Sequence, residues 1–149
     1  GIAIIRVGAA TKIEMIEKKH RIEDALEAVR SAQQEGIIPG GGMMLYRIAK
    51  DLSVDVENEE QGLGVNIVRH ALQSPLEIMA KNSGIDIEEV FASLESAEGE
   101  NMGINFSTGQ TVNLLEEGII DPVKVTRCAL QNAASVAGTL ITTNHAIVE

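Results

Sequence analysis

Hydrophobic residues recur at helical spacing over most of the chain. Between residues 12 and 34 the apolar positions follow the i, i+3, i+4, i+7 pattern of an amphipathic helix, at Ile22, Ala25, Leu26, Val29 and Ala32. Thr11 and Glu14 have the spacing of a capping box, and Gly36 is a typical C-terminal stop. The pattern therefore predicts a long helix from about Lys12 to Gln34.

Further helices are predicted at residues 43–52, 62–73, 74–84, 86–96 and 121–143. A break is expected before Pro75, because proline lacks the backbone N–H that a helix interior uses, and Ser74 with Glu77 would cap the segment that follows. In the last helix Asp121 is predicted as the N-cap and Pro122 as the first helical residue. Small residues in this helix would let a neighbouring helix approach closely: Ala129, Ala133, Ala134, Ala137 and Gly138.

Only short segments favour strands. Residues 2–8, "IAIIRVG", are rich in β-branched side chains and predict a strand near the N-terminus. Residues 97–113 contain Gly, Asn, Ser and Thr around an alternating segment, which predicts a small hairpin with a turn at Gly109. Residues 144–149 are a possible edge strand. The predicted fold class is mainly α, with one β-hairpin and short terminal strands.

Composition and charge exclude several classes of protein. Hydrophobic residues make up 44% of the chain, yet there are only two Phe, one Tyr and no Trp, so the core must be aliphatic. The formal net charge is −10, which provides no basic stripe for nucleic acid. The single cysteine excludes a disulfide framework and makes the reducing cytoplasm the expected compartment. Apolar runs are too short to span a membrane, so no membrane partner is expected.

The glycine triplet in "PGGG", residues 39–42, has two possible interpretations. It can be a tight connection between helices, or a place where the backbone must come close to a ligand and any Cβ would be in the way. Neither of the two common glycine-rich nucleotide motifs, G-x-x-x-x-G-K-[ST] and G-x-G-x-x-G, occurs in the chain.

Three polar residues are candidates for chemistry. Asp24 is predicted in mid-helix, either as a surface acid beside Glu23 and Glu27 or as a carboxylate that positions a metal or an attacking water. Asp121 is a good N-cap whose second oxygen can bind a ligand, and Asn105 can read a base edge or hold a turn. The histidines are scattered and Cys128 stands alone, so no metal site is predicted.

Four stretches in this order resemble one family. They are "GAATKIEMIEKKHRIEDALEAVRSAQQEGIIPGGG", "SPLEIMAKNSG", "GIIDPVKVTRCALQNAASVAG" and a late "ITT". Together they resemble the group I chaperonins of the GroEL type, which are ATP-driven protein-folding machines. The resemblance implies that the chain is the C-terminal part of a subunit. Residues 1–35 would be the segment of the intermediate domain that leads the chain back to the equatorial domain. Residues 36–149 would be the second half of the equatorial, ATP-binding helical bundle.

The resemblance also implies a nucleotide site. Asp24 matches the aspartate that contacts the magnesium–phosphate region and orients the attacking water. Gly41 matches a glycine close to the ribose, and Asp121 matches the aspartate that binds the ribose hydroxyls. Asn105, Phe106 and Ser107 match the adenine side, where the family usually has "NAAT" and this chain has "NFST". The departure places a bulkier side chain at the edge of the site, or requires Phe106 to point away.

Cofactors and partners follow from the same resemblance. ATP and Mg²⁺ are the expected cofactors, and a double heptameric ring is the expected homo-oligomer. A lid-like co-chaperonin and unfolded proteins would bind through an apical domain that these residues do not include. The family's phosphate-gripping Asp-Gly-Thr-Thr loop is also absent from this sequence. The alternative is therefore that the isolated chain is a structural or oligomerisation helical domain without ATPase activity.

Overall fold

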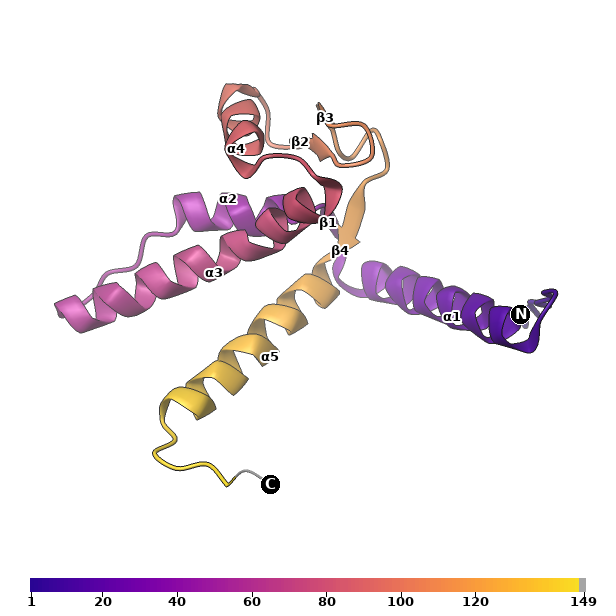
Figure 1. The fold of residues 1–149 in the computed structure, drawn as a ribbon, viewed down its shortest axis with the longest axis horizontal. Coiled ribbons are helices and arrows are strands. Elements are labelled where there is room, and N and C mark those ends of the chain that lie inside the picture. Colours follow the sequence, from indigo (N-terminus) through magenta and orange to yellow (C-terminus); the bar gives the residue numbers. More distant parts are fainter. Residues whose placement is uncertain (148–149) are drawn as a thin grey trace. The chain divides into compact units, whose positions relative to one another are not determined.

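The computed structural model describes residues 1–147 and divides the chain into two compact units. Unit 1 combines residues 1–36 with the residues from 122 onward, and unit 2 is formed by residues 37–121 (Figure 1). One junction between the units follows Gly36, one residue after the predicted domain boundary. The assignment of the segments to intermediate and equatorial domains stays a prediction.

Unit 1 contains two long helices. Helix α1 spans Lys12–Glu35 and begins with the predicted capping box, in which Thr11 and Glu14 exchange side-chain and backbone hydrogen bonds. It ends at Gly36, which adopts φ +89°. Helix α5 spans Val123–Ile141. The last turn of α1 binds the first turns of α5: Arg127 Nε donates to Glu35 Oε2 at 2.9 Å, and Lys124 Nζ donates to Gln34 Oε1 at 2.6 Å.

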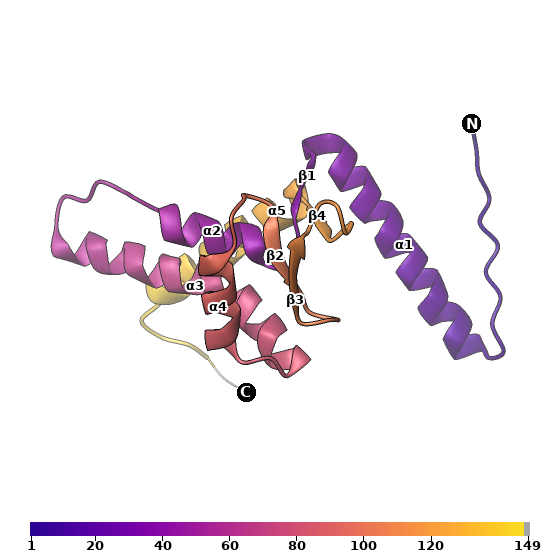
Figure 2. The same ribbon diagram turned by 90° about the horizontal axis from the view of Figure 1, so that it is seen from above.

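Unit 2 is built from three helices and two small sheets (Figures 1 and 2). Strands β2 and β3 form the predicted antiparallel hairpin, with Met102 opposite Asn113 and Asn105 opposite Gln110. Its turn ends at Gly109, as predicted, with φ +73°. The second sheet pairs β1 with β4. The elements are β1 Ile37–Pro39, α2 Met43–Asp51, α3 Glu59–Ser83, α4 Ile87–Ser96, β2 Met102–Asn105, β3 Gln110–Asn113 and β4 Ile120–Pro122.

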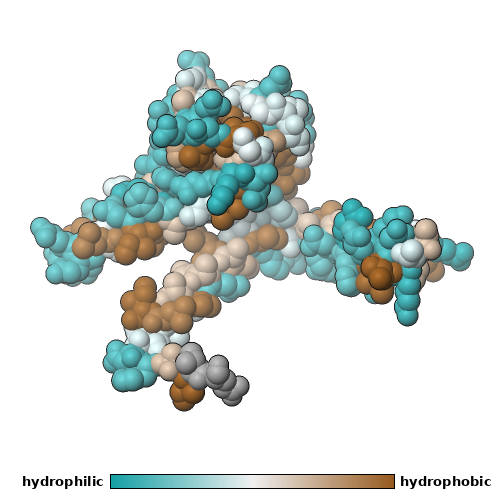
Figure 3. Space-filling model, in the orientation of Figure 1, coloured by the Kyte–Doolittle hydropathy of each residue, from teal (hydrophilic) through white to brown (hydrophobic). Residues whose placement is uncertain are grey.

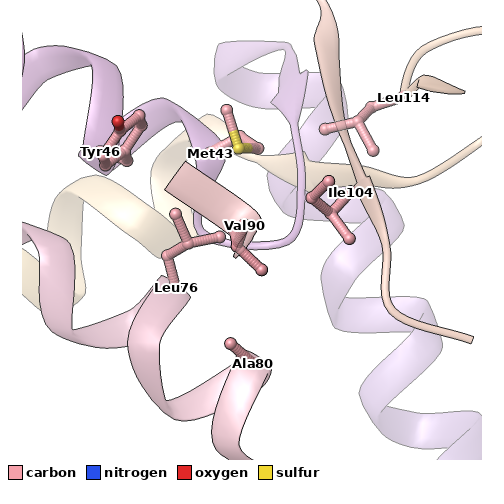
Figure 4. Packing of buried hydrophobic residues seen from close by; sticks show 7 residues of the cluster. All are labelled: Met43, Tyr46, Leu76, Ala80, Val90, Ile104 and Leu114. Atoms are coloured by element: carbon pink, nitrogen blue, oxygen red, sulfur yellow. The ribbon is translucent and has the colours of Figure 1, made fainter. Parts of the chain in front are cut away.

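The core of unit 2 is almost entirely aliphatic, as the composition predicts. Side chains from α2, α3, α4 and the hairpin segment meet in one cluster (Figure 4), formed by Met43, Tyr46, Leu76, Ala80, Val90, Ile104 and Leu114. Tyr46 is the one aromatic member, and its ring stacks on Phe91 with centroids 5.2 Å apart. The mainly helical fold class is thus confirmed.

The predicted N-terminal strand is wrong. Residues 1–9 form no strand with any part of the chain from 1 to 147, and Ile2 is 96% exposed. A strand needs a partner for its backbone hydrogen bonds, and β propensity alone does not provide one. The possible C-terminal strand is not formed at residues 144–147, and its last two residues lie outside those the structure describes.

The predicted break before Pro75 is also wrong, because α3 runs without interruption through this proline. Leu72, Leu76 and Ala80 are all buried and lie four residues apart, so they occupy one face of a single helix. A break at Pro75 would separate Leu72 from the other two. Burial of this face therefore outweighs the cost of an interior proline, which is about 3 kcal/mol.

Apolar surface remains exposed on α5. The predicted small-residue stripe lies uncovered in the described chain, and Val136, Leu140 and Ile141 are exposed as well. Figure 3 shows hydrophobic surface along this helix. Within residues 1–147 no helix is both long and apolar enough to cross a membrane.

Candidate functional site

Each glycine of the triplet lies against a different neighbour. A Cβ on Gly40 would lie 3.2 Å from the backbone of Ile119 and Ile120, and the Gly40 N–H donates to the Ile119 carbonyl at 2.9 Å. A Cβ on Gly42 would lie 2.9 Å from the backbone nitrogen of Leu76 in α3. Gly41 has φ +69°, and the nearest atom to its missing Cβ is Cε2 of Phe106, at 3.9 Å. Gly40 and Gly42 thus allow close packing, whereas the space beside Gly41 is open except for the aromatic ring.

The hairpin turn is held by Asn105. Its side-chain Oδ1 accepts from the Ser107 N–H at 3.0 Å, and its carbonyl accepts from the N–H groups of Thr108 and Gly109 at 3.1 and 2.8 Å. The sequence left two roles for Asn105, reading a base edge or holding a turn, and its oxygens hold the turn. The turn fixes the position of Phe106, whose half-buried side chain packs against the core cluster.

Asp121 is not the N-cap of the last helix. It lies in β4, the chain stays extended through Pro122 at φ −69°, ψ 129°, and the N-cap of α5 is Pro122. The prediction fails because pairing of β4 with β1 continues the strand one residue beyond the expected cap. The Asp121 carboxylate is half-buried and makes no side-chain hydrogen bond within residues 1–147, and burial raises its pKa above the usual 3.8. Its oxygens are therefore available to a ligand's donors.

The structure brings several predicted residues together within unit 2. Phe106 adjoins Gly41, and the backbone of Ile120, which is bonded to Asp121, adjoins Gly40. Three segments that are far apart in sequence, around residues 41, 106 and 121, therefore converge on the glycine triplet. Ser107 is exposed at the hairpin turn.

Asp24 belongs to unit 1. It is exposed on α1, and it forms no ion pair or side-chain hydrogen bond with any described residue. Its acidic neighbours differ, because Glu23 pairs with Lys19 at 3.1 Å and Glu27 pairs with Arg30. The neighbouring acidic residues thus form ion pairs along the helix surface, but Asp24 forms none with the described residues.

Sequence reasoning missed two structural contributions to this region. Gly40 and Gly42 are packed more closely against their neighbours than Gly41, and the glycine triplet is the one sequence signal for this close packing. Arg47 on α2 donates through Nη2 to the carbonyls of Gly99 and Met102, both at 2.9 Å, and so holds the entry to the hairpin. Nothing in the pattern "MMLYRIAK" distinguishes this arginine from a surface residue. Among residues 1–147 no group of three or more His, Cys, Asp or Glu side chains is placed to hold a metal ion.

Comparison with known proteins identifies the fold's relatives. The family model described as the TCP-1/cpn60 chaperonin family matches residues 1–149. A crystal structure of a group III chaperonin in the open state is similar, with a TM-score of 0.81 and 27% sequence identity. The match covers 95% of this chain and 30% of that chain, so the present chain spans about a third of its relative's length. The resemblance to chaperonins is thereby confirmed at the level of the family, whereas membership of group I stays a prediction.

Proposed function

The chain belongs to the TCP-1/cpn60 chaperonin family, and we propose that it forms part of an ATP-driven chaperone subunit of the GroEL type. In this proposal unit 2 contributes one side of the nucleotide cleft and α1 contributes the carboxylate that promotes hydrolysis. The observation that carries the proposal is the convergence of Gly41, Phe106 and the segment of Asp121 on one loop of unit 2.

The geometry fits a nucleotide in two respects. Gly41 presents bare backbone, so a ribose can approach where a side chain would obstruct it. Asp121 presents a half-buried carboxylate with no protein donor among the described residues, which is an unfavourable arrangement for a charged group. Two ribose hydroxyls would supply the missing donors. Asn105, Phe106 and Ser107 would then lie on the side of the base.

We assign the hydrolytic role to Asp24. Its carboxylate is free and is held on a long, capped helix, which suits a group that must orient a water molecule. By the family resemblance, the segment that carries Asp24 would swing down over bound ATP before hydrolysis. When bound, ATP would supply the phosphoryl group and Mg²⁺ would neutralise its charge. Further phosphate and metal ligands would come from sequence beyond these residues.

The wider setting is proposed from the same family resemblance. The subunit would assemble into a double heptameric ring in the cytoplasm, where it would bind unfolded proteins and a co-chaperonin lid through an apical domain. The net charge of −10 is compatible with an acidic protein that does not bind nucleic acid.

Substitution of Asp24 tests the proposed function. In the natural full-length polypeptide, Asp24→Ala should lower the rate of ATP hydrolysis by about 100-fold or more, because general-base groups contribute roughly 10²–10⁴-fold. Nucleotide affinity, measured by calorimetry, should stay within about twofold. Glu23→Ala is the matched control, since it removes an adjacent exposed carboxylate and should leave turnover intact. Lost affinity, or unchanged turnover, in Asp24→Ala would contradict the assigned role.

A second candidate function concerns the 149 residues alone. The uncovered apolar face of α5 favours a helical domain that serves structure or oligomerisation, without ATPase activity of its own. We expect the purified chain to show no magnesium-dependent ATP turnover and to associate in light-scattering measurements. Measurable hydrolysis by these residues would exclude this alternative.

A further inference from the structure

Four consecutive backbone donors at the hairpin turn, those of residues 107–110, are already occupied. The N–H groups of Ser107, Thr108 and Gly109 bind the two oxygens of Asn105, and the N–H of Gln110 donates to Thr108 Oγ1 at 3.4 Å. A protein that reads a purine by its edge commonly offers it such backbone groups. Here the amides from 107 to 110 are used in the turn itself.

An aromatic surface takes the place of these donors. The Phe106 ring packs against the core cluster, which fixes its position, and a minor part of its surface stays exposed. Its Cε2 atom lies 3.9 Å from the position of a Cβ on Gly41, so the ring borders the open space beside the bare backbone. A flat ring at the edge of such a space is suited to stacking, and every nucleobase has a π-face that can stack.

We propose that Phe106 is the base platform of the nucleotide site, and that the base is held by stacking on this ring instead of by the amides of residues 107–110. This inference rests on the proposed nucleotide-binding function. Its consequence is weak discrimination between purines, because stacking tolerates different bases whereas a site built on hydrogen bonds rejects the wrong one strongly. Guanine nucleotides should therefore bind nearly as well as adenine nucleotides.

The test compares three ligands by calorimetry in the natural full-length polypeptide: ADP, GDP and ribose 5-diphosphate, which lacks a base. Phe106→Leu keeps an apolar side chain in contact with the core and removes the ring, and Phe106→Tyr keeps the ring. We expect wild-type affinities for ADP and GDP within about tenfold of each other. Phe106→Leu should weaken both by about tenfold, in the range reported for loss of one stacked base. It should leave ribose 5-diphosphate unchanged, and Phe106→Tyr should bind like the wild type.

The outcomes separate the two proposals. If the wild type binds none of the three ligands, the proposed nucleotide site is refuted and the base platform with it. If the wild type binds ADP but Phe106→Leu binds it equally well, or if ADP is preferred over GDP by more than about 1,000-fold, the base platform alone is refuted. Far-ultraviolet circular dichroism, which reports the helix content, confirms that each variant is folded.

Discussion

Replacing Gly42 with alanine tests how tightly the glycine loop is packed on α3. Gly42 has φ +76°, and a Cβ there would lie 2.9 Å from the nitrogen and 3.1 Å from the Cα of Leu76. Carbon atoms in good contact are about 3.5–4.0 Å apart. Both neighbouring atoms belong to the backbone of a continuous helix, so neither can rotate away and the loop or the helix must shift.

The loss of unfolding free energy in Gly42→Ala is best measured relative to a second variant, Gly84→Ala. Gly84 has nearly the same φ, +72°, also lies in unit 2, and has no atom within 4 Å of its missing Cβ. The strain of left-handed backbone, about 1–2 kcal/mol, and the gain from a stiffer unfolded chain apply equally to both positions and cancel. What remains is the cost of overpacking, about 1–3 kcal/mol. We therefore expect Gly42→Ala to be less stable than Gly84→Ala by that amount.

The assay is urea denaturation followed by tyrosine fluorescence. The chain has one tyrosine and no tryptophan, and Tyr46 is 6% exposed in the core of unit 2, so the signal reports on this unit alone. The free energy of unfolding is compared at equal m-values. If Gly42→Ala is no less stable than Gly84→Ala, the loop yields easily and the close approach to α3 is not a structural constraint.

Three further predictions concern charge and packing. Burial raises the pKa of Asp121, so the stability linked to its protonation is fully present below pH 3.8 and is lost as the pH rises through the folded-state pKa. Over this pH range Asp121→Asn should become more stable than the wild type. Urea denaturation at several pH values measures the difference. The hydrogen bond from Arg127 lowers the pKa of Glu35, so the stability that this pair contributes is fully present above pH 4.5 and is lost as the pH falls through the lowered folded-state pKa. Glu35→Gln should therefore speed amide exchange in the first turn of α5 at pH 7, whereas Glu27→Gln, which breaks a pair within α1, should not. Leu76→Ala, which empties a fully buried position, should cost about 2–5 kcal/mol by tyrosine fluorescence, and a cost below 1 kcal/mol would contradict the packing described.

Elements with local signals could be predicted from the sequence. The capping box of Thr11 and Glu14, the stop at Gly36 and the hairpin turn at Gly109 all depend on residues within a few positions of one another. Their hydrogen bonds form wherever the chain is placed. The ends of these elements therefore agree closely with the sequence pattern.

Features that depend on distant partners could not be predicted. Helix α3 passes through Pro75 because its buried face needs both halves, and the pairing of β4 with β1 keeps Asp121 out of the helix. The segment at residues 2–8 has strand-like residues but no strand beside it in the described chain. For the site, the sequence pattern indicated Gly41, Asn105 and Asp121 through family resemblance, whereas only the structure shows that the Asn105 oxygens are used within the turn.

The glycine triplet has a consequence for how this loop can change length. Surface loops usually accept insertions and deletions, because their residues have few fixed neighbours. Here three consecutive positions face three different elements: Gly40 faces the β4 segment, Gly41 the Phe106 ring, and Gly42 helix α3. Adding or deleting one residue would shift every position to the wrong neighbour at once. The loop should therefore accept some changes of residue while keeping its length invariant, and its register is as fixed as that of a strand within a sheet.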